Sequence, residues 1–448
     1  MNEKSDMLKG NAVRSVILFA LPIMLSQLLQ FNYIFVDNII VGRYVSTDAL
    51  AAVGNVGAIN SFVIGAALGL TSGFTIPVAH AFGAGNKRLL SRYTGSSIVV
   101  SFSMGLVIVI TAHLLSRPLL KLIGTPDEII DLSAAYVNIL YFGVPFQMLS
   151  NNFTAISRAV GESKKPLYFF TVSVFVNLML DLLFVKKLGW GVQGAAAATL
   201  ISHCVAALLT GIYIFKYNNS VDIKKDDLRF DKKIAFEQVK LGIPVSLQFT
   251  ITSIGSMALQ SAVNGFGSNV IAGFTAANRV ENITNIPLSA FGVASQTFAG
   301  QNFGAENYER ITQNIKKILA LSICTSVVMS AVLVFAGPSL VSLFMTEKNE
   351  EIMFAAKSYL NAIAQCYSLV ALLLLIRNVL QGFGYTYANT IAGIGELFGR
   401  LAVAFILTPY IGFPAVCYAG PIAWLMADIP LTVIYIIKMK EFKKKARV

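Results

Sequence analysis

The chain has 448 residues, of which 55% are hydrophobic and 13% charged, and its mean hydropathy is +0.67. An average soluble domain carries about 25% charged residues, so this composition excludes a soluble globular protein and indicates a polytopic membrane protein. The net charge of +12 is spread over many short segments, which argues against nucleic-acid binding.

Apolar stretches of about 20 residues, long enough to cross a bilayer as a helix, occur along the whole chain. The first contains Pro22 and Asp37 and lacks the small-residue cleavage site of a signal peptide, so we expect a retained helix. The expected fold class is all-α integral membrane. The twelve predicted spans lie at 12–39, 50–76, 93–115, 133–156, 167–185, 191–214, 238–264, 270–299, 313–336, 354–380, 386–407 and 414–437.

The basic residues predict the orientation. Most of the 35 Lys and Arg fall on the side of the N-terminus if twelve spans are threaded through a membrane. The positive-inside rule then places both termini in the cytoplasm, and the basic tail from Lys438 to Arg447 lies against anionic lipid. We expect a multi-pass protein of the plasma membrane, a monomer in contact with membrane lipids.

The two halves of the chain resemble each other. The motif Phe82-Gly83-Ala84-Gly85-Asn86 of the first half recurs in the second as Phe303-Gly304-Ala305-Glu306-Asn307. Leu21-Pro22-Ile23 recurs as Ile243-Pro244-Val245, and Tyr136 with Asn138 recurs as Tyr359 with Asn361. The offsets between the copies are nearly equal, and they predict two pseudo-symmetric six-helix lobes in the same orientation.

The longest polar stretch divides the halves. We expect an N-terminal lobe at 1–215, a cytoplasmic linker at 216–236, and a C-terminal lobe with the basic tail at 237–448. Two such lobes leave a central cleft, which would open to each side of the membrane in turn as the lobes rock.

Two aspartates, Asp37 and Asp181, lie inside apolar spans of the first half without a basic residue beside them. A carboxylate in a membrane helix costs about 2.5–3.5 kcal/mol on insertion scales, so it is first interpreted as an ion or proton site. Both residues lie about 7–9 Å below the outer end of their helix, at about 1.5 Å per residue. Tyr33 and Asn177 lie one turn deeper on the same helical faces. With Thr199 on the sixth helix they offer the oxygen ligands that a proton or small cation needs.

The alternative for both aspartates is a structural role, in which they bond to neighbouring helices. The second half carries three intramembrane ionisable residues of each sign, and Glu396 and Arg400 are spaced i,i+4. We therefore expect a charge network that neutralises itself, with Asp428 as the exception. Its members are Arg279, Glu281, Arg377, Glu396, Arg400 and Asp428.

Aromatic and polar residues of the spans are candidates for the substrate cleft, since aromatic rings attract organic cations. The candidates are Phe31, Phe35, Tyr136, Tyr141, Phe146, Phe153, Gln248 and Asp428. No Walker motif is present, so ATP is not the direct energy source. No nucleophile–base or metal constellation is present either, and we expect neither an enzyme nor a cofactor, only H⁺ or Na⁺ as coupling ion.

A family resemblance follows from three motifs: the spacing of Pro22 and Asp37, Arg158-Ala159-Val160-Gly161 before Lys164-Lys165-Pro166, and Asn177-x-x-x-Asp181. With these motifs the whole chain resembles the multidrug and toxic compound extrusion (MATE) family. The resemblance implies proton or sodium coupling through Tyr33, Asp37, Asn177, Asp181 and Thr199. It is closer to the DinF-like branch than to the NorM-like branch, because the seventh and tenth helices lack the acidic cation ligands of the latter.

The sequence thus predicts a secondary active exporter of small organic, often cationic, compounds in exchange for H⁺ or Na⁺. The alternative is a flippase of lipids or lipid-linked precursors on a similar architecture. Such a protein would need arginines for a pyrophosphate, and the predicted spans of the first lobe contain none apart from Arg14 at the start of the first span. A channel or receptor would need neither duplicated lobes nor a buried titratable pair.

Overall fold

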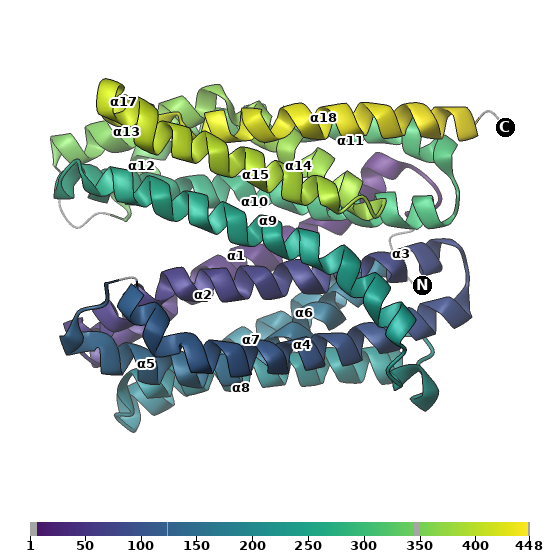
Figure 1. Cartoon of the computed structure of the whole chain (residues 1–448), viewed down its shortest axis with the longest axis horizontal. Helices are drawn as coiled ribbons and strands as arrows, with labels where there is room; N and C mark the ends of the chain where they lie inside the picture. Colours follow the sequence, from purple (N-terminus) through teal and green to yellow (C-terminus); the bar gives the residue numbers. More distant parts are fainter. Residues whose placement is uncertain (1–6, 123, 345–348, 447–448) are drawn as a thin grey trace. The chain divides into compact units, whose positions relative to one another are not determined.

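The computed structural model describes residues 7–122, 124–344 and 349–446. Within these ranges the chain consists of helices joined by short turns (Figure 1). The first half contains α1 (Ala12–Tyr44), α2 (Thr47–Phe74), α3 (Ile76–Gly83), α4 (Lys87–Leu122), α5 (Asp127–Phe142), α6 (Val144–Ala159), α7 (Lys164–Asp181), η1 (Leu182–Lys187), α8 (Gly191–Ile212), η2 (Tyr213–Tyr217) and η3 (Lys225–Leu228). The second half contains α9 (Lys232–Asn264), α10 (Ser268–Gly304), α11 (Tyr308–Phe335), α12 (Gly337–Ser342), α13 (Glu350–Gln365), α14 (Tyr367–Gly382), α15 (Tyr387–Leu401), η4 (Ala402–Leu407), α16 (Thr408–Ile411), α17 (Phe413–Cys417) and α18 (Ala419–Lys445). The all-α membrane class is confirmed.

The number of spans is close to the prediction but not identical with it. In the described part of the chain, nine helices are long and apolar enough to cross a membrane, or eleven if two bent helix pairs each count as one span. The pairs α5–α6 and α13–α14 bend by 45° and 56° where single spans were predicted. α6 begins at Val144, and Pro145 lies in its first turn, just after Gly143; a proline cannot continue the hydrogen-bond ladder of the preceding helix. The span predicted at 270–299 lies in the long helix α10.

The backbone repeats itself in the way that the sequence predicts. The π-helix η1 follows α7 in the first half, and the π-helix η4 follows α15 at the corresponding place in the second. The break at Gly143 recurs at Cys366, at the same offset that relates Tyr136 to Tyr359. Gly85 and Glu306 lie at the same place in their motifs and both have positive φ, 67° and 56°. Since Glu306 has a Cβ that disfavours this conformation, the shared turn geometry supports the repeat.

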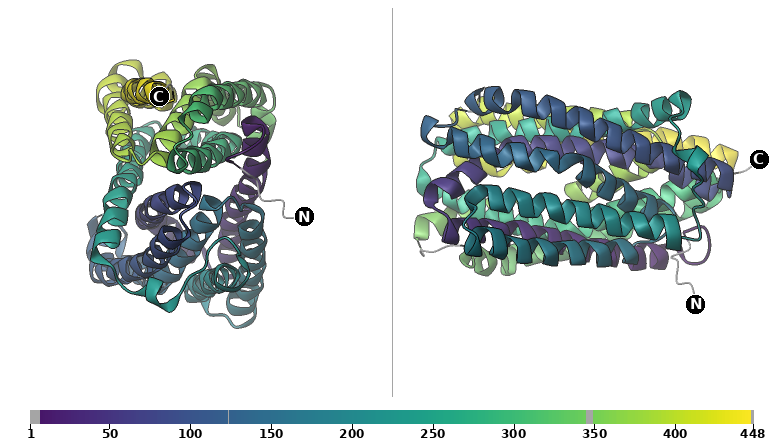
Figure 2. Two further views of the ribbon diagram at one scale, coloured as in Figure 1. Left: turned by 90° about the vertical axis from the view of Figure 1, so that its right-hand side faces the viewer. Right: turned by 90° about the horizontal axis from the view of Figure 1, so that it is seen from below.

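Packing divides the chain into two compact units. Among the described residues, unit 1 comprises 25–246, and unit 2 comprises the segment before residue 25 and the segment from 247 onward. Viewed end-on, the helices of each unit form a bundle (Figure 2). The long helices α1 and α9 each contribute one part to unit 1 and the other part to unit 2. These bounds differ from the predicted domains 1–215, 216–236 and 237–448, which follow the sequence repeat and stay a prediction.

The predicted linker packs onto α4 as part of unit 1. Ser91 Oγ donates to the carbonyl of Asp222 at 2.5 Å, and Arg92 pairs with Asp231 at 2.6 Å. The backbone N–H groups of Ile234 and Lys233, together with Arg92, hold the pKa of Asp231 below its ordinary value. The polar segment is therefore anchored to one unit by hydrogen bonds and an ion pair.

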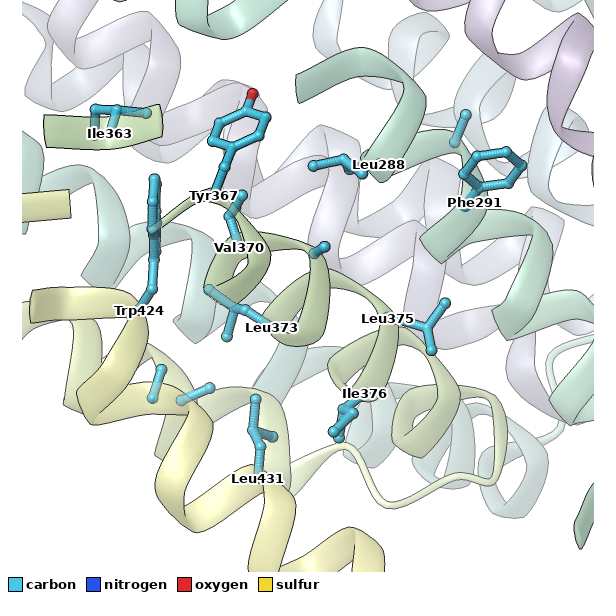
Figure 3. Close-up of a cluster of buried hydrophobic side chains, with 14 of the residues drawn as sticks. Leu288, Phe291, Ile363, Tyr367, Val370, Leu373, Leu375, Ile376, Trp424 and Leu431 are labelled. Carbon is cyan, nitrogen blue, oxygen red and sulfur yellow. The ribbon is translucent and has the colours of Figure 1, made fainter. Parts of the chain in front are cut away.

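The core of unit 2 surrounds α14 (Figure 3). Side chains of α10, α13 and α18 pack against α14 from several sides, among them Leu288, Ile363 and Leu431. The ring of Tyr367 meets Trp424 edge-on at 6.4 Å, and its hydroxyl lies 2.8 Å from Thr284 Oγ1. This dense packing fixes α14 and α18, which carry charged residues of the second-half network.

Small residues bring α2 and α9 close together in unit 1. A Cβ at Gly69 would lie 2.5 Å from the Cα of Ser246, and a Cβ at Gly73 would overlap the backbone of Gly242. Glycines four residues apart on one helix face allow such close approach between membrane helices.

We expect Gly73→Ala to destabilise the protein by about 1–3 kcal/mol, because the added methyl group overpacks the α2–α9 contact. Gly57 on the same helix is the matched control, since a Cβ there would meet nothing within 4 Å. Gly57→Ala should be neutral or stabilising by up to about 1 kcal/mol, from helix propensity alone. Thermal unfolding of both variants in one detergent measures the difference, and equal unfolding temperatures would contradict the prediction.

Candidate functional site

The predicted coupling residues meet in unit 1 from three helices. Tyr33 and Asp37 lie on α1, Asn177 and Asp181 on α7, and Thr199 on α8. Asp181 is the last residue of α7, and the π-helix η1 begins at the next residue. π-Helical turns are rare and frequently occur at functional sites, and this one reorients the chain directly behind the carboxylate.

The two carboxyl groups lie near each other. Asp37 and Asp181 interact electrostatically. One turn deeper, the Tyr33 hydroxyl lies 3.1 Å from Thr199 Oγ1. Asp181 and Thr199 are buried, at 1% and 7% exposed, and Tyr33 and Asp37 are half-buried.

The site leaves hydrogen-bonding capacity unused. Oδ1 of Asp37, both carboxyl oxygens of Asp181 and Nδ2 of Asn177 are buried and have no hydrogen-bond partner among the described residues. Two ionised carboxylates can only accept hydrogen bonds, so they cannot bond to each other. Their negative charges also repel each other unless a proton or a cation lies between them. Leaving such groups unsatisfied is costly, and one bound positive charge would satisfy the pair.

The donor set suits a light ion. It offers two carboxylates, an amide and two hydroxyls, all hard oxygen ligands. Within the described residues, no three His, Cys, Asp or Glu side chains gather as they would around a metal ion. Hard oxygen ligands of this kind do not suit a soft metal.

Tyr136 on α5 also belongs to this neighbourhood. Its hydroxyl lies close enough to Asp37, Tyr33 and Asp181 to interact with them electrostatically. The sequence placed Tyr136 among the cleft candidates and gave it no part in coupling. The sequence repeat pairs Tyr136 with Tyr359, and this pairing was the sequence feature that could have indicated the position of Tyr136. In unit 2, Tyr359 donates a 2.6 Å hydrogen bond to Glu281. The repeated tyrosine thus lies beside a buried carboxyl group in each unit.

The other cleft candidates lie in different surroundings. Tyr141 and Phe153 are buried in the core of unit 1, where Phe153 packs edge-on against Phe215 at 6.3 Å. Gln248 in unit 2 is buried and donates to Thr252 Oγ1 at 3.3 Å. The half-buried aromatic candidates are Phe31 and Phe146. The side chain of Phe35 lies outside the described residues.

Unit 2 holds the predicted charge network. Glu396 on α15 accepts from Arg377 of α14 at 3.1 Å and from Arg400 one turn along α15 at 3.3 Å. The i,i+4 pairing of Glu396 and Arg400 is confirmed. Glu281 interacts electrostatically with Arg400 and accepts the Tyr359 bond. Glu396 is therefore compensated twice, unlike the aspartates of unit 1.

Arg279 and Asp428 take no part in the ion pairs of this central triad. The guanidinium of Arg279 lies 5.9 Å from the centre of the Phe344 ring. Asp428 on α18 interacts electrostatically with Arg377 and Glu396. Both of its carboxyl oxygens are buried and have no hydrogen-bond partner in the described part of the chain. Asp428 is thus the carboxylate of unit 2 that most resembles Asp181.

One family model, MatE, matches the chain twice, at residues 22–183 and 244–406. The two matches begin at Pro22 and Pro244, the prolines that the sequence repeat places at equivalent positions. The chain therefore belongs to the MatE family. One solved structure with a similar fold is described as that of "a multidrug resistance MATE family transporter of the MOP superfamily"; it matches with a TM-score of 0.91 at 24% identity and covers 99% of each chain.

Similar proteins cover nearly the whole chain. "Probable multidrug resistance protein YoeA" of Bacillus subtilis (strain 168) is 30% identical over 91% of this chain and 91% of its own length. "Probable multidrug resistance protein YpnP" of the same organism is 29% identical over 85% of this chain and 84% of its own length. A crystal structure of MATE in the bent conformation matches all of both chains with a TM-score of 0.91 at 24% identity, which shows the shared fold. The DinF-like branch stays a prediction.

Proposed function

We propose that the protein is a secondary active exporter that exchanges small organic, often cationic, compounds for H⁺ or Na⁺. The observation that carries this proposal is the electrostatically coupled pair Asp37 and Asp181. Oδ1 of Asp37 and both carboxyl oxygens of Asp181 are buried and lack hydrogen-bond partners among the described residues. A pair of this kind binds one positive charge well and two negative charges poorly. An ion that enters from outside and leaves inside would load and unload it.

The energy of ion entry is sufficient for export. An inward monovalent cation gains about 2.3 kcal/mol per 100 mV, which corresponds to about fifty-fold accumulation per charge. The protein exposes its binding sites to one side of the membrane at a time, so that the ion and the compound move in opposite directions. The coupling residues are Asp37 and Asp181, with Asn177, Thr199 and Tyr33 as their polar surroundings.

The substrate class follows from the relatives and from charge. The two Bacillus subtilis relatives are named as multidrug resistance proteins. An organic cation and a coupling ion can each neutralise a carboxylate of this pair. Binding of either cation therefore weakens the binding of the other. Tyr136 beside the pair offers an aromatic face that attracts cations.

We place the protein in the plasma membrane as a multi-pass monomer with both termini in the cytoplasm. The basic residues of the N-terminal segment, the linker and the tail support this orientation. Membrane lipids surround the apolar helix faces, and nucleic acid has no part in the function.

The alternative function is that of a lipid or lipid-linked precursor flippase. A flippase that holds a pyrophosphate needs arginines that are free to bind it. In unit 2, Arg377 and Arg400 both donate to Glu396, and this engagement favours the exporter.

The test is efflux of a fluorescent organic cation, such as ethidium, from proteoliposomes. We expect efflux when a pH gradient is imposed, or when a Na⁺ gradient is imposed, and no efflux from liposomes without protein. The gradient that drives efflux identifies the coupling ion. Efflux that persists unchanged after both gradients are collapsed by ionophores would overturn the proposal, and movement of labelled lipid alone would favour the flippase.

A further inference from the structure

A cavity of about 590 Å³ lies in unit 2 where α1 and α11 begin. Its size is in the range of small-molecule sites, about 300–1,000 Å³. Three basic side chains line it, Arg14 from α1 and Arg310 and Lys317 from α11. The amides of Asn11, Gln313 and Asn314 add polar groups, and none of the described lining residues is acidic. The Gln313 amide donates one N–H to Glu309 at 2.8 Å and the Asn314 amide donates one to the carbonyl of Arg310 at 2.9 Å, which leaves each amide a second N–H. The cavity is therefore strongly cationic.

The cationic wall is built into the fold. The Arg310 guanidinium donates to the backbone carbonyls of Met7, Lys9 and Gly10 at 2.9–3.2 Å. These bonds fix the segment before α1 against the start of α11. The guanidinium also lies 5.6 Å from the centre of the Phe298 ring, and an arginine stays protonated in proteins.

The two helices also direct their positive ends to this cavity. Asn11 caps α1 by accepting from the N–H of Arg14 at 3.1 Å, and Asn307 caps α11 by accepting from the N–H of Arg310 at 3.2 Å. Both helices therefore begin beside the cavity, and each adds the positive end of its dipole to the basic side chains. The electrostatic field favours an anion.

The apolar side of the cavity continues along α1. Ile17 and Leu18 line it, and Leu18 and Leu21, three residues apart on one face of α1, are 51% and 52% exposed. An exposed apolar helix face in a membrane protein contacts acyl chains. Cationic groups at a helix end with an apolar track beside them match a molecule that has an anionic head and a hydrocarbon tail.

We propose that this cavity binds the headgroup of an anionic phospholipid, with an acyl chain along Leu18 and Leu21. The phosphate lies among Arg14, Arg310 and Lys317, and the amides bond to the glycerol oxygens. A free phosphate would satisfy the basic groups but would leave the apolar track without a partner. The lipid holds the first half of α1 against α11. This site does not depend on the proposed transport function.

The experiment titrates the purified full-length protein with dioleoyl phosphatidylglycerol and, separately, with dioleoyl phosphatidylcholine, and counts bound lipids by native mass spectrometry. We expect one phosphatidylglycerol to bind much more tightly than phosphatidylcholine. In the double variant Arg14→Gln, Lys317→Gln, binding should weaken about thirty-fold, about fivefold for each cation removed. Arg310 is kept because its backbone contacts hold the N-terminal segment.

Lys316→Gln is the matched control, since Lys316 is exposed on α11 next to Lys317 but does not line the cavity. It should bind phosphatidylglycerol like the native chain, and all variants should unfold at the native temperature. Equal binding of the two lipids, or an equal loss in Lys316→Gln and the double variant, would overturn the proposal. So would competition by glycerol phosphate as strong as that by the lipid, because the acyl chain would then contribute nothing.

Discussion

Asp181→Asn and Asp37→Asn should each abolish ion-driven efflux while the protein remains folded. The native protein at about 100 mV is expected to sustain about fifty-fold accumulation per coupled charge. Either variant should reduce this ratio to about one, because an amide cannot bind a proton in exchange or neutralise a cation. The measurement is efflux from proteoliposomes under the gradient that drives the native protein.

Asp131→Asn is the control for these variants. Asp131 forms an exposed pair with Arg117, and its side chain is 78% exposed, so its loss should leave efflux unchanged. Thermal unfolding of each variant separates a coupling defect from a folding defect. Unchanged efflux in both Asp37→Asn and Asp181→Asn would contradict the assignment. The next carboxylate to test would be Asp428 of unit 2, whose oxygens have no hydrogen-bond partner among the described residues.

Helical spacing predicts which residues of the proposed coupling site share a helix face. Tyr33 and Asp37 are four residues apart, as are Asn177 and Asp181, and such pairs share one face of a helix. Thr199 could be added because neighbouring spans run in opposite directions at a known rise per residue. The structure brings these residues together in one unit.

Features that depend on contacts between helices could not be predicted in the same way. The π-helix after Asp181 has no sequence signature, because its hydrogen-bond pattern depends on how α7 packs on α8. Arg377 of α14 pairs with Glu396 of α15, 19 residues further along the chain. Helical periodicity predicts contacts within one helix, so it could not predict this pair between two helices. The division of α1 and α9 between two units likewise follows from packing, such as the close approach of α2 and α9 at Gly73 and Gly242.

Alignment of the two repeats shows why buried carboxyl groups have basic partners in unit 2 and lack them in unit 1. When Pro22 is aligned with Pro244, Gly255 stands where Tyr33 stands in unit 1, and Leu259 stands where Asp37 stands. A Cβ at Gly255 would lie 3.2 Å from Cδ of Arg400, so the arginine side chain lies against the glycine. The duplicated fold thus holds an uncompensated carboxyl pair in unit 1 and a compensated ionic network in unit 2.

Glu396→Gln should destabilise the protein by about 3–5 kcal/mol, because the variant would leave two buried cations without the carboxylate between them. The side chains of Arg377 and Arg400 are only 14% and 12% exposed. The free energy of unfolding, measured in one detergent for the native chain and the variant, gives the difference. Glu441→Gln is the control: it breaks the more exposed Lys438 pair and should cost at most about 1 kcal/mol.

A double variant tests whether the cost arises from the buried charges. Arg377→Met combined with Glu396→Gln removes one of the two unpaired cations, so it should cost less than the sum of the single variants. Additive effects would show that Arg377 and Glu396 act independently. A cost for Glu396→Gln as small as that for Glu441→Gln would show that water reaches the cluster and screens its charges. The compensated network would then be unnecessary for stability, and its arginines would be free to bind an anionic substrate.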